Sequence, residues 1–155
     1  MTKLLLSLHV LAALVAVGPV TVAASMFPAT LRRASGDGDA RTTLRTLHRI
    51  CRVYAGIGIA VPLFGLATAS SLGVLGDTWL ITSILLTAAA AGVLTLLILP
   101  AQDRALAETT SSSSPSPAPI SSTPGRLAMI TGIFNLLWAT VTVLMIIRPG
   151  STTGA

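Results

Sequence analysis

The stretch RRASGDGDARTTLRTLHRICR, residues 32–52, decides the fold because it gathers positive charge between two long apolar segments. It carries six of the ten lysines and arginines in the 155-residue chain. The apolar segment on each side has about 20 residues or more, the length that a helix needs to cross the ~30 Å hydrocarbon core of a bilayer. The stretch is therefore typical of a cytoplasmic loop in an integral membrane protein.

Four apolar stretches in the chain are long enough to span a membrane. They occupy residues 4–27, 53–72, 79–99 and 127–147, and none of them contains Lys, Arg, Asp or Glu. Their lack of alternating polarity favours helices over transmembrane strands. We therefore expect an all-α fold: one membrane domain, residues 1–148, built as an antiparallel bundle of four transmembrane helices.

The overall composition agrees with a lipid-covered surface. Hydrophobic residues make up 52% of the chain and charged residues 10%, whereas soluble domains carry about 25% charged residues. The net charge of +5 does not indicate nucleic acid, because the basic residues flank the spans without interleaved aromatics. The single cysteine, Cys51, excludes an internal disulfide and a thiolate metal cluster.

Loop charge predicts how the chain is oriented. Residues 32–52, Arg104 and Arg126 place eight cations on one side, and Lys3 and Arg148 place two on the other. We expect the connecting loops in the cytoplasm of a bacterial plasma membrane and both termini outside. An alternative stays open: Lys3, an apolar run and the tripeptide at residues 22–24 resemble a cleavable signal peptide, which would put the arginines outside.

The charged stretch continues into the second span as a basic amphipathic helical extension. Arginines recur at steps of four, four and three and form a lipid-facing basic collar: Arg41, Arg45, Arg49 and Arg52. This spacing places them on one helical face, while Leu44, Leu47 and Cys51 fall on another. The basic collar suits anionic inner-leaflet lipids as partners, or it is ordinary flanking charge that orients the span.

The remaining features of the sequence are connecting segments and prolines. Residues 109–124 form a Ser/Pro-rich linker that we expect to be disordered, and the tail at 149–155 is expected to fray. The short connection at 73–78 predicts an antiparallel hairpin of spans two and three. Pro19 and Pro62 are expected to kink spans one and two.

Small residues at helical spacing are expected to mark where the helices pack. They are Ala12, Ala13, Ala16 and Ala23 in span one; Gly56, Gly58, Ala60, Gly65 and Ala67 in span two; Ala88 and Gly92 in span three; and Ala128 and Gly132 in span four. In span four, Asn135 is expected to form an interhelical polar contact. Candidate partners lie in span three, namely Thr82, Ser83 and Thr87.

His9 is the most suggestive residue for function, because an imidazole inside an apolar helix is rare. It could ligate haem iron or copper or relay protons, or it could be a neutral side chain hydrogen-bonded to a neighbouring helix. His48 is expected at the inner interface, about a bilayer thickness from His9, so the two cannot share one metal. The sequence contains no catalytic motif and no carboxylate within a span.

Several short motifs add a family resemblance. Leu8-His9-Val10, Gly18-Pro19, residues 28–33 and residues 49–54 resemble an uncharacterised family of small four-helix bacterial membrane proteins. That family is distantly similar to CopD-type copper-resistance domains and to HemJ-type protoporphyrinogen oxidases. The HemJ-type resemblance implies His9 as a haem ligand, but the later lysine ligand of those enzymes is missing, since Lys3 is the only lysine. The abundance of alanine and the Ser/Pro linker resemble an actinobacterial protein.

Two hypotheses follow from these observations. The first is a non-enzymatic four-helix membrane protein, an accessory subunit of a larger complex without a cofactor. The second is a haem- or copper-handling membrane protein with His9 as ligand.

Overall fold

The computed structural model describes residues 2–34, 38–111 and 124–150. The regular elements within these ranges are all helices: α1 (Thr2–Arg33), α2 (Gly38–Ile57), α3 (Ala60–Leu72), α4 (Thr78–Gly92), the π-helix η1 (Val93–Ile98), α5 (Leu99–Ser111) and α6 (Pro124–Ile147). They form four units long and apolar enough to cross a membrane: Thr2–Arg33, Gly38–Leu72, Thr78–Thr110 and Pro124–Ile147. The all-α, four-span expectation is confirmed.

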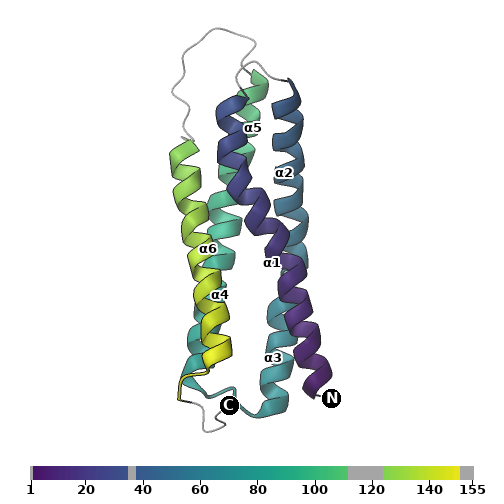
Figure 1. Ribbon diagram of the computed structural model, residues 1–155, viewed down its shortest axis with the longest axis vertical. Helices are drawn as coiled ribbons and strands as arrows, with labels where there is room; N and C mark the ends of the chain where they lie inside the picture. Colours follow the sequence, from purple (N-terminus) through teal and green to yellow (C-terminus); the bar gives the residue numbers. More distant parts are fainter. Residues whose placement is uncertain (1, 35–37, 112–123, 151–155) are drawn as a thin grey trace.

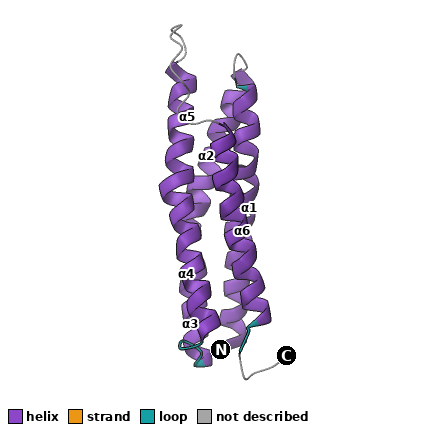
Figure 2. Ribbon diagram, turned by 90° about the vertical axis from the view of Figure 1, so that its left-hand side faces the viewer, coloured by secondary structure: helices purple, strands orange, loops and turns teal. Residues whose placement is uncertain are grey.

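The units form an elongated antiparallel bundle (Figures 1 and 2). The start of α1 and the end of α6 lie at one end, which we call the terminal end (Figure 1). The end of α1, the start of α2, α5 and the start of α6 lie at the other, which we call the basic end because it carries the eight cations of the two loops. Spans two and three are thus the expected antiparallel hairpin.

Three units are longer than a bilayer requires. The first has 32 residues, the second 35 and the third 33, whereas about 20 residues cross the hydrocarbon core. The apolar parts of these units lie toward the terminal end. The charged half of α2 and most of α5 therefore extend beyond the length that the hydrocarbon core of a bilayer would cover. The helical extension before the second span is confirmed, with all four arginines of the basic collar exposed and Leu44, Leu47 and Cys51 buried.

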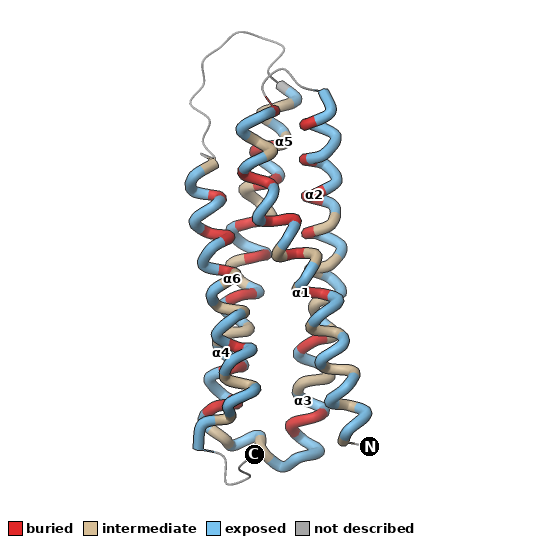
Figure 3. The backbone as a smooth tube through the Cα atoms, viewed as in Figure 1, coloured by how far each residue is buried: buried red, intermediate tan, exposed pale blue. Residues whose placement is uncertain are grey.

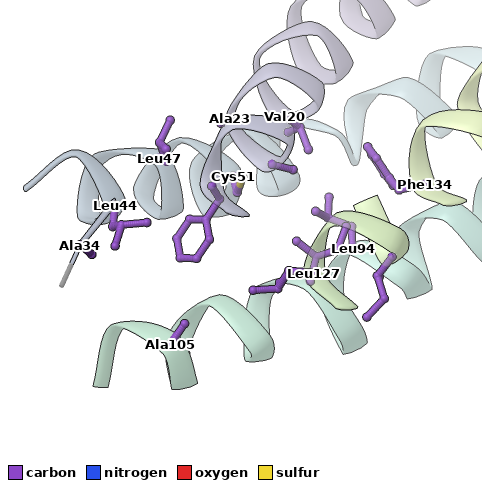
Figure 4. Packing of buried hydrophobic residues seen from close by; sticks show 14 of the residues in the cluster. Val20, Ala23, Ala34, Leu44, Leu47, Cys51, Leu94, Ala105, Leu127 and Phe134 are labelled. Carbon is purple, nitrogen blue, oxygen red and sulfur yellow. The ribbon is translucent and has the colours of Figure 1, made fainter. Parts of the chain in front are cut away.

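The main hydrophobic core lies toward the basic end and in the middle of the bundle (Figure 3). From α1 it takes Val20, Ala23 and Phe27, which recur at steps of three and four and so share one helical face. Leu44 of α2 and Ile98 of η1 are fully buried in the same cluster. Figure 4 shows Leu94, Leu127 and Phe134 gathered where η1 and α6 approach one another.

The terminal half is packed more openly. There α3 packs against α1, and α4 packs against α6. The hydrophobic contact between α3 and α4 is a small cluster at their connected ends, formed by Ala69, Trp79 and Leu80 with Val74 beside it. The bundle therefore has its dense core at one end and two loosely associated helix pairs at the other.

Proline explains two irregularities in the helices. The second span breaks at Gly58–Ile59, four residues before Pro62, where Val61 N–H donates to the Gly58 carbonyl at 3.1 Å. Pro62 has no N–H to bond that carbonyl, so the turn tightens there. In the third span, η1 widens the helix directly before Pro100, whose ring would otherwise press on the preceding turn. By contrast, α1 stays one continuous helix through Pro19.

Several of the expected small-residue contacts are wrong. Ala16 and Ala23 are buried, but Gly56, Ala67, Ala88, Ala128 and Gly132 are exposed. The buried face of α6 is formed by bulkier residues: Leu127, Ile130, Thr131, Phe134 and Val141. Large side chains that interlock across this face gain more contact than the small stripe does, so the stripe turns outward.

The structure also moves the edges of the expected Ser/Pro linker. Residues 109–111 are the last of α5, and Pro124 is the first of α6. The remainder of the linker, and residues 151–155 of the tail, lie outside the described residues.

Candidate functional site

A buried polar cluster joins α2 to α5 near the basic end. His48 Nδ1 lies 3.0 Å from Gln102 Oε1, and His48 Nε2 lies 3.0 Å from Asp103 Oδ1. The Gln102 amide donates in turn to Cys51 Sγ at 3.7 Å. His48 is only 8% exposed and Gln102 is 0% exposed, so their mutual contact is shielded from solvent, whereas the side chain of Asp103 is 61% exposed. His48 and Cys51 are one turn apart on α2, which lets the adjacent pair on α5 meet both.

The geometry of this cluster assigns a role to each group. His48 Nδ1 faces the amide oxygen of Gln102, which can only accept, so Nδ1 is the donor of this hydrogen bond. The carboxylate of Asp103 lies beside the ring, with Oδ1 3.0 Å from His48 Nε2. Gln102 uses both ends of its amide, the oxygen toward His48 and the nitrogen toward Cys51. A network with these partners fixes the register of α2 against α5.

His9 makes a different contact, between α1 and α3. Its Nδ1 lies 2.9 Å from the carbonyl oxygen of Val61, so Nδ1 carries a proton and donates it to this oxygen. The ring lies against Gly65, where an added Cβ would be 2.9 Å from His9 Cε1. The close approach of the two helices at this point therefore depends on glycine.

Asn135 also forms a contact between helices, but with a partner other than the expected ones. Its Nδ2 donates to Ser25 Oγ of α1 at 3.2 Å. The hydroxyls of span three are used within their own helix: Thr82 donates to Thr78 O at 2.8 Å, Ser83 to Trp79 O at 2.8 Å, and Thr87 to Ser83 O at 2.7 Å. Each therefore bonds the carbonyl one turn back, so its hydroxyl proton is not available to α6.

An aromatic contact closes the terminal end. Trp79 donates from Nε1 to Asp77 Oδ2 at 3.0 Å, and the guanidinium of Arg148 lies 5.6 Å from the centroid of its ring. The pair ties the start of α4 to the end of α6. Trp79 thus sits at the end of a span, where an amphipathic ring is expected.

Metal-binding potential is limited in the described part of the chain. No group of three or more His, Cys, Asp or Glu residues is close enough there to hold a metal ion. His9 and His48 lie in different halves of the bundle, His9 against α3 and His48 against α5.

A protein-family model described as "Predicted integral membrane protein (DUF2269)" matches residues 3–149. The chain belongs to the DUF2269 family. The match covers all four helical units, so the DUF2269 domain is the whole bundle described above. No curated protein and no solved structure matches the chain. The resemblance to an uncharacterised family of integral membrane proteins is confirmed.

Sequence reasoning missed two members of the polar cluster in this DUF2269 protein, Gln102 and Asp103. Both lie just beyond the third apolar run, which ends at residue 99. One signal was present in the sequence, since Gln102 is the only glutamine of the chain. The hairpin of spans two and three brings this residue near the helix that carries Cys51. Which residues of the two helices face one another also depends on the register of the hairpin, and the sequence alone does not define that register.

Proposed function

We propose that this DUF2269 protein is a non-enzymatic membrane subunit that accompanies a larger membrane complex. The observation that carries the proposal is how its buried polar groups are used. His9 bonds Val61, His48 bonds Gln102, and Asn135 bonds Ser25, each time between two helices. A polar side chain that bonds a neighbouring helix in this way supports assembly of the bundle.

The proposed subunit sits in the bacterial plasma membrane with its basic end in the cytoplasm and both termini outside. The basic collar supports this orientation, because exposed arginines next to a span are retained on the cytoplasmic side. Exposed cations at that level also favour anionic inner-leaflet lipids, at about 1 kcal/mol each.

Neutralising Arg32, Arg33, Arg41 and Arg45 to glutamine together will scramble the orientation of the protein. Half of the eight cations at the basic end are then gone, and the charge asymmetry that retains this end in the cytoplasm is weakened. Reporter fusions to the C-terminus, one active only outside and one only inside, measure the effect. Unchanged reporter activities in the variant would contradict the proposed basis of orientation.

The accessory role is tested on the tagged full chain extracted with a mild detergent or a native-nanodisc polymer. We expect a particle larger than the 15.8 kDa chain, with one other membrane protein at constant stoichiometry. A preparation that is monodisperse and monomeric across several extraction conditions would reject the proposal.

A second candidate function, haem or copper handling, has one observation in its favour. Histidines that bind metals usually donate their other ring N–H to a carbonyl or carboxylate. His9 Nδ1 has this arrangement with Val61 O at 2.9 Å, which leaves Nε2 for a ligand. His9 would then hold the iron or copper, and the group would supply redox chemistry within the membrane.

The two functions predict different results for His9→Ala. If His9 serves packing, the purified wild type is colourless and free of copper, and the variant loses stability by about 0.6 to 2 kcal/mol, the worth of a buried interhelical hydrogen bond. Visible spectra, metal analysis and thermal unfolding in detergent measure these properties. A Soret band or stoichiometric copper in the wild type, lost in His9→Ala, would establish the second function instead.

A further inference from the structure

A small cavity lies between the third and fourth helical units. Its volume is about 150 Å³. Its lining comes from three helices: Leu96 and Leu97 of η1; Pro100, Ala101 and Arg104 of α5; and Arg126, Leu127 and Ile130 of α6. Among the described residues that line it, none carries a carboxylate, so the two guanidinium groups have no acidic neighbour within the cavity.

The lining changes from charged to apolar along the bundle. Arg104 follows the third apolar run by one helical turn, and Arg126 directly precedes the fourth. Both arginines therefore lie at the level of the membrane surface, and the leucines and Ile130 lie deeper. This order matches an amphiphile whose anionic head is at the surface and whose apolar chain points into the hydrocarbon.

The walls of the cavity differ in exposure in a way that suits a lipid. Leu96 is 74% exposed and Leu97 is 45% exposed, so this wall opens outward to the bilayer. Leu127 and Ile130 are buried and form the floor. A cavity of about 150 Å³ can hold a group the size of benzene, or about six carbons. The space therefore accommodates the first part of an acyl chain, while the rest remains among the lipids.

We propose that this cavity binds one anionic phospholipid. Arg104 and Arg126 hold its phosphate, because guanidinium groups match phosphate oxygens with paired N–H donors. The apolar floor contacts the beginning of an acyl chain. A free inorganic anion has no apolar part that could make this contact. The site is distinct from the basic collar on α2. It rests on the proposed seating of the basic end at a membrane surface, and it holds in either orientation of the protein.

Native mass spectrometry of the full chain in detergent tests the proposal, with phosphatidylglycerol and phosphatidylcholine of identical acyl chains as probes. We expect wild type to retain one phosphatidylglycerol at concentrations where it retains no phosphatidylcholine. The double variant Arg104→Gln/Arg126→Gln should bind that lipid at least tenfold more weakly. Equal retention by wild type and double variant would overturn the proposal.

A matched control separates a built site from diffuse charge. Arg32→Gln/Arg33→Gln removes the same charge from the same end of the bundle but lies outside the cavity, and it should keep the tightly held lipid. If the control loses the lipid as fully as the double variant, no discrete site exists. Because the assay uses purified protein, it can fail while the topology proposed above stands.

Two further arms test the nature of the occupant. Millimolar inorganic phosphate should not displace the lipid; complete displacement would identify an anion site instead of a lipid site. Ala101→Phe, which fills the cavity and keeps both arginines, should lower retention, and undiminished binding would place the lipid elsewhere. If Ala101→Phe does not fold, Leu96→Gln at an exposed position replaces it, and it should also lower retention of the lipid.

Discussion

Replacing Gly65 with alanine is expected to destabilise this DUF2269 protein by about 1–3 kcal/mol, the usual cost of overpacking a filled contact. The new Cβ would lie 2.9 Å from His9 Cε1 and 3.1 Å from its Nδ1. The imidazole must move away, and its 2.9 Å contact with Val61 O is then lost. Thermal unfolding of the purified protein in detergent, followed by circular dichroism, measures the loss.

Gly56→Ala is the matched control for this substitution. It lies in the same helical unit, and a Cβ at this position would meet nothing within 4 Å. Alanine is the better helix former by about 1 kcal/mol, so Gly56→Ala should be neutral or slightly stabilising. An equal loss of stability in the two variants would show that His9 is not the cause.

A double variant makes the test specific for the ring. In a His9→Ala background the imidazole is absent, so Gly65→Ala should cost at least 1 kcal/mol less than it does in wild type. This coupling is the pairwise energy between positions 9 and 65. The same cost in both backgrounds would contradict the packing described between α1 and α3.

Replacing Gln102 with alanine should have an effect at least as large. Its side chain is completely buried and bonded to both His48 and Cys51. The substitution leaves His48 Nδ1 without its acceptor, at about 1–3 kcal/mol, and adds a void, so we expect a total of about 2–4 kcal/mol. The contact between α2 and α5 should open correspondingly more often.

Cys51 offers a direct readout of that opening, because it is buried in the cluster and is the only cysteine of the chain. A loss of 1.4 kcal/mol is a factor of ten in an equilibrium constant. Labelling of Cys51 by a membrane-permeant maleimide should therefore accelerate more than tenfold in Gln102→Ala, and the rate can be measured in intact membranes by mass shift.

Asp103→Asn serves as the comparison for Gln102→Ala. The side chain of Asp103 is 61% exposed, and partners of this exposure contribute about 0–1 kcal/mol. The rate at which Cys51 is labelled in Asp103→Asn should stay within a fewfold of the rate in wild type. If Asp103→Asn accelerates labelling as much as Gln102→Ala does, the amide of Gln102 is not what holds the two helices together.

The features predicted correctly are those that the sequence encodes locally. The length of an apolar run and the count of cations beside it are both properties of a short segment, so the four spans and the basic extension could be predicted. The basic collar also follows from spacing alone, because a step of three or four residues defines a helical face.

The features that were missed depend on which helices meet and in what register. Asn135 could be predicted to need a partner, but its pairing with Ser25 depends on α6 lying against α1. The outward turn of Ala128 and Gly132 depends on how Phe134 and its neighbours interlock. The polar cluster of His48 and Gln102 likewise exists only because α5 continues past the apolar run and lies along α2.

The open packing of α3 and α4 has a consequence for how the molecule meets membranes of different thickness. These two helices can change their tilt independently, since each packs mainly against a different neighbour and the hydrophobic cluster that they share lies near Trp79. Tilting is the least costly way for a helix to match a thinner or thicker bilayer. Hydrophobic mismatch would therefore be absorbed at the terminal end, while the register of the helices around Phe27 and Gln102 stays unchanged.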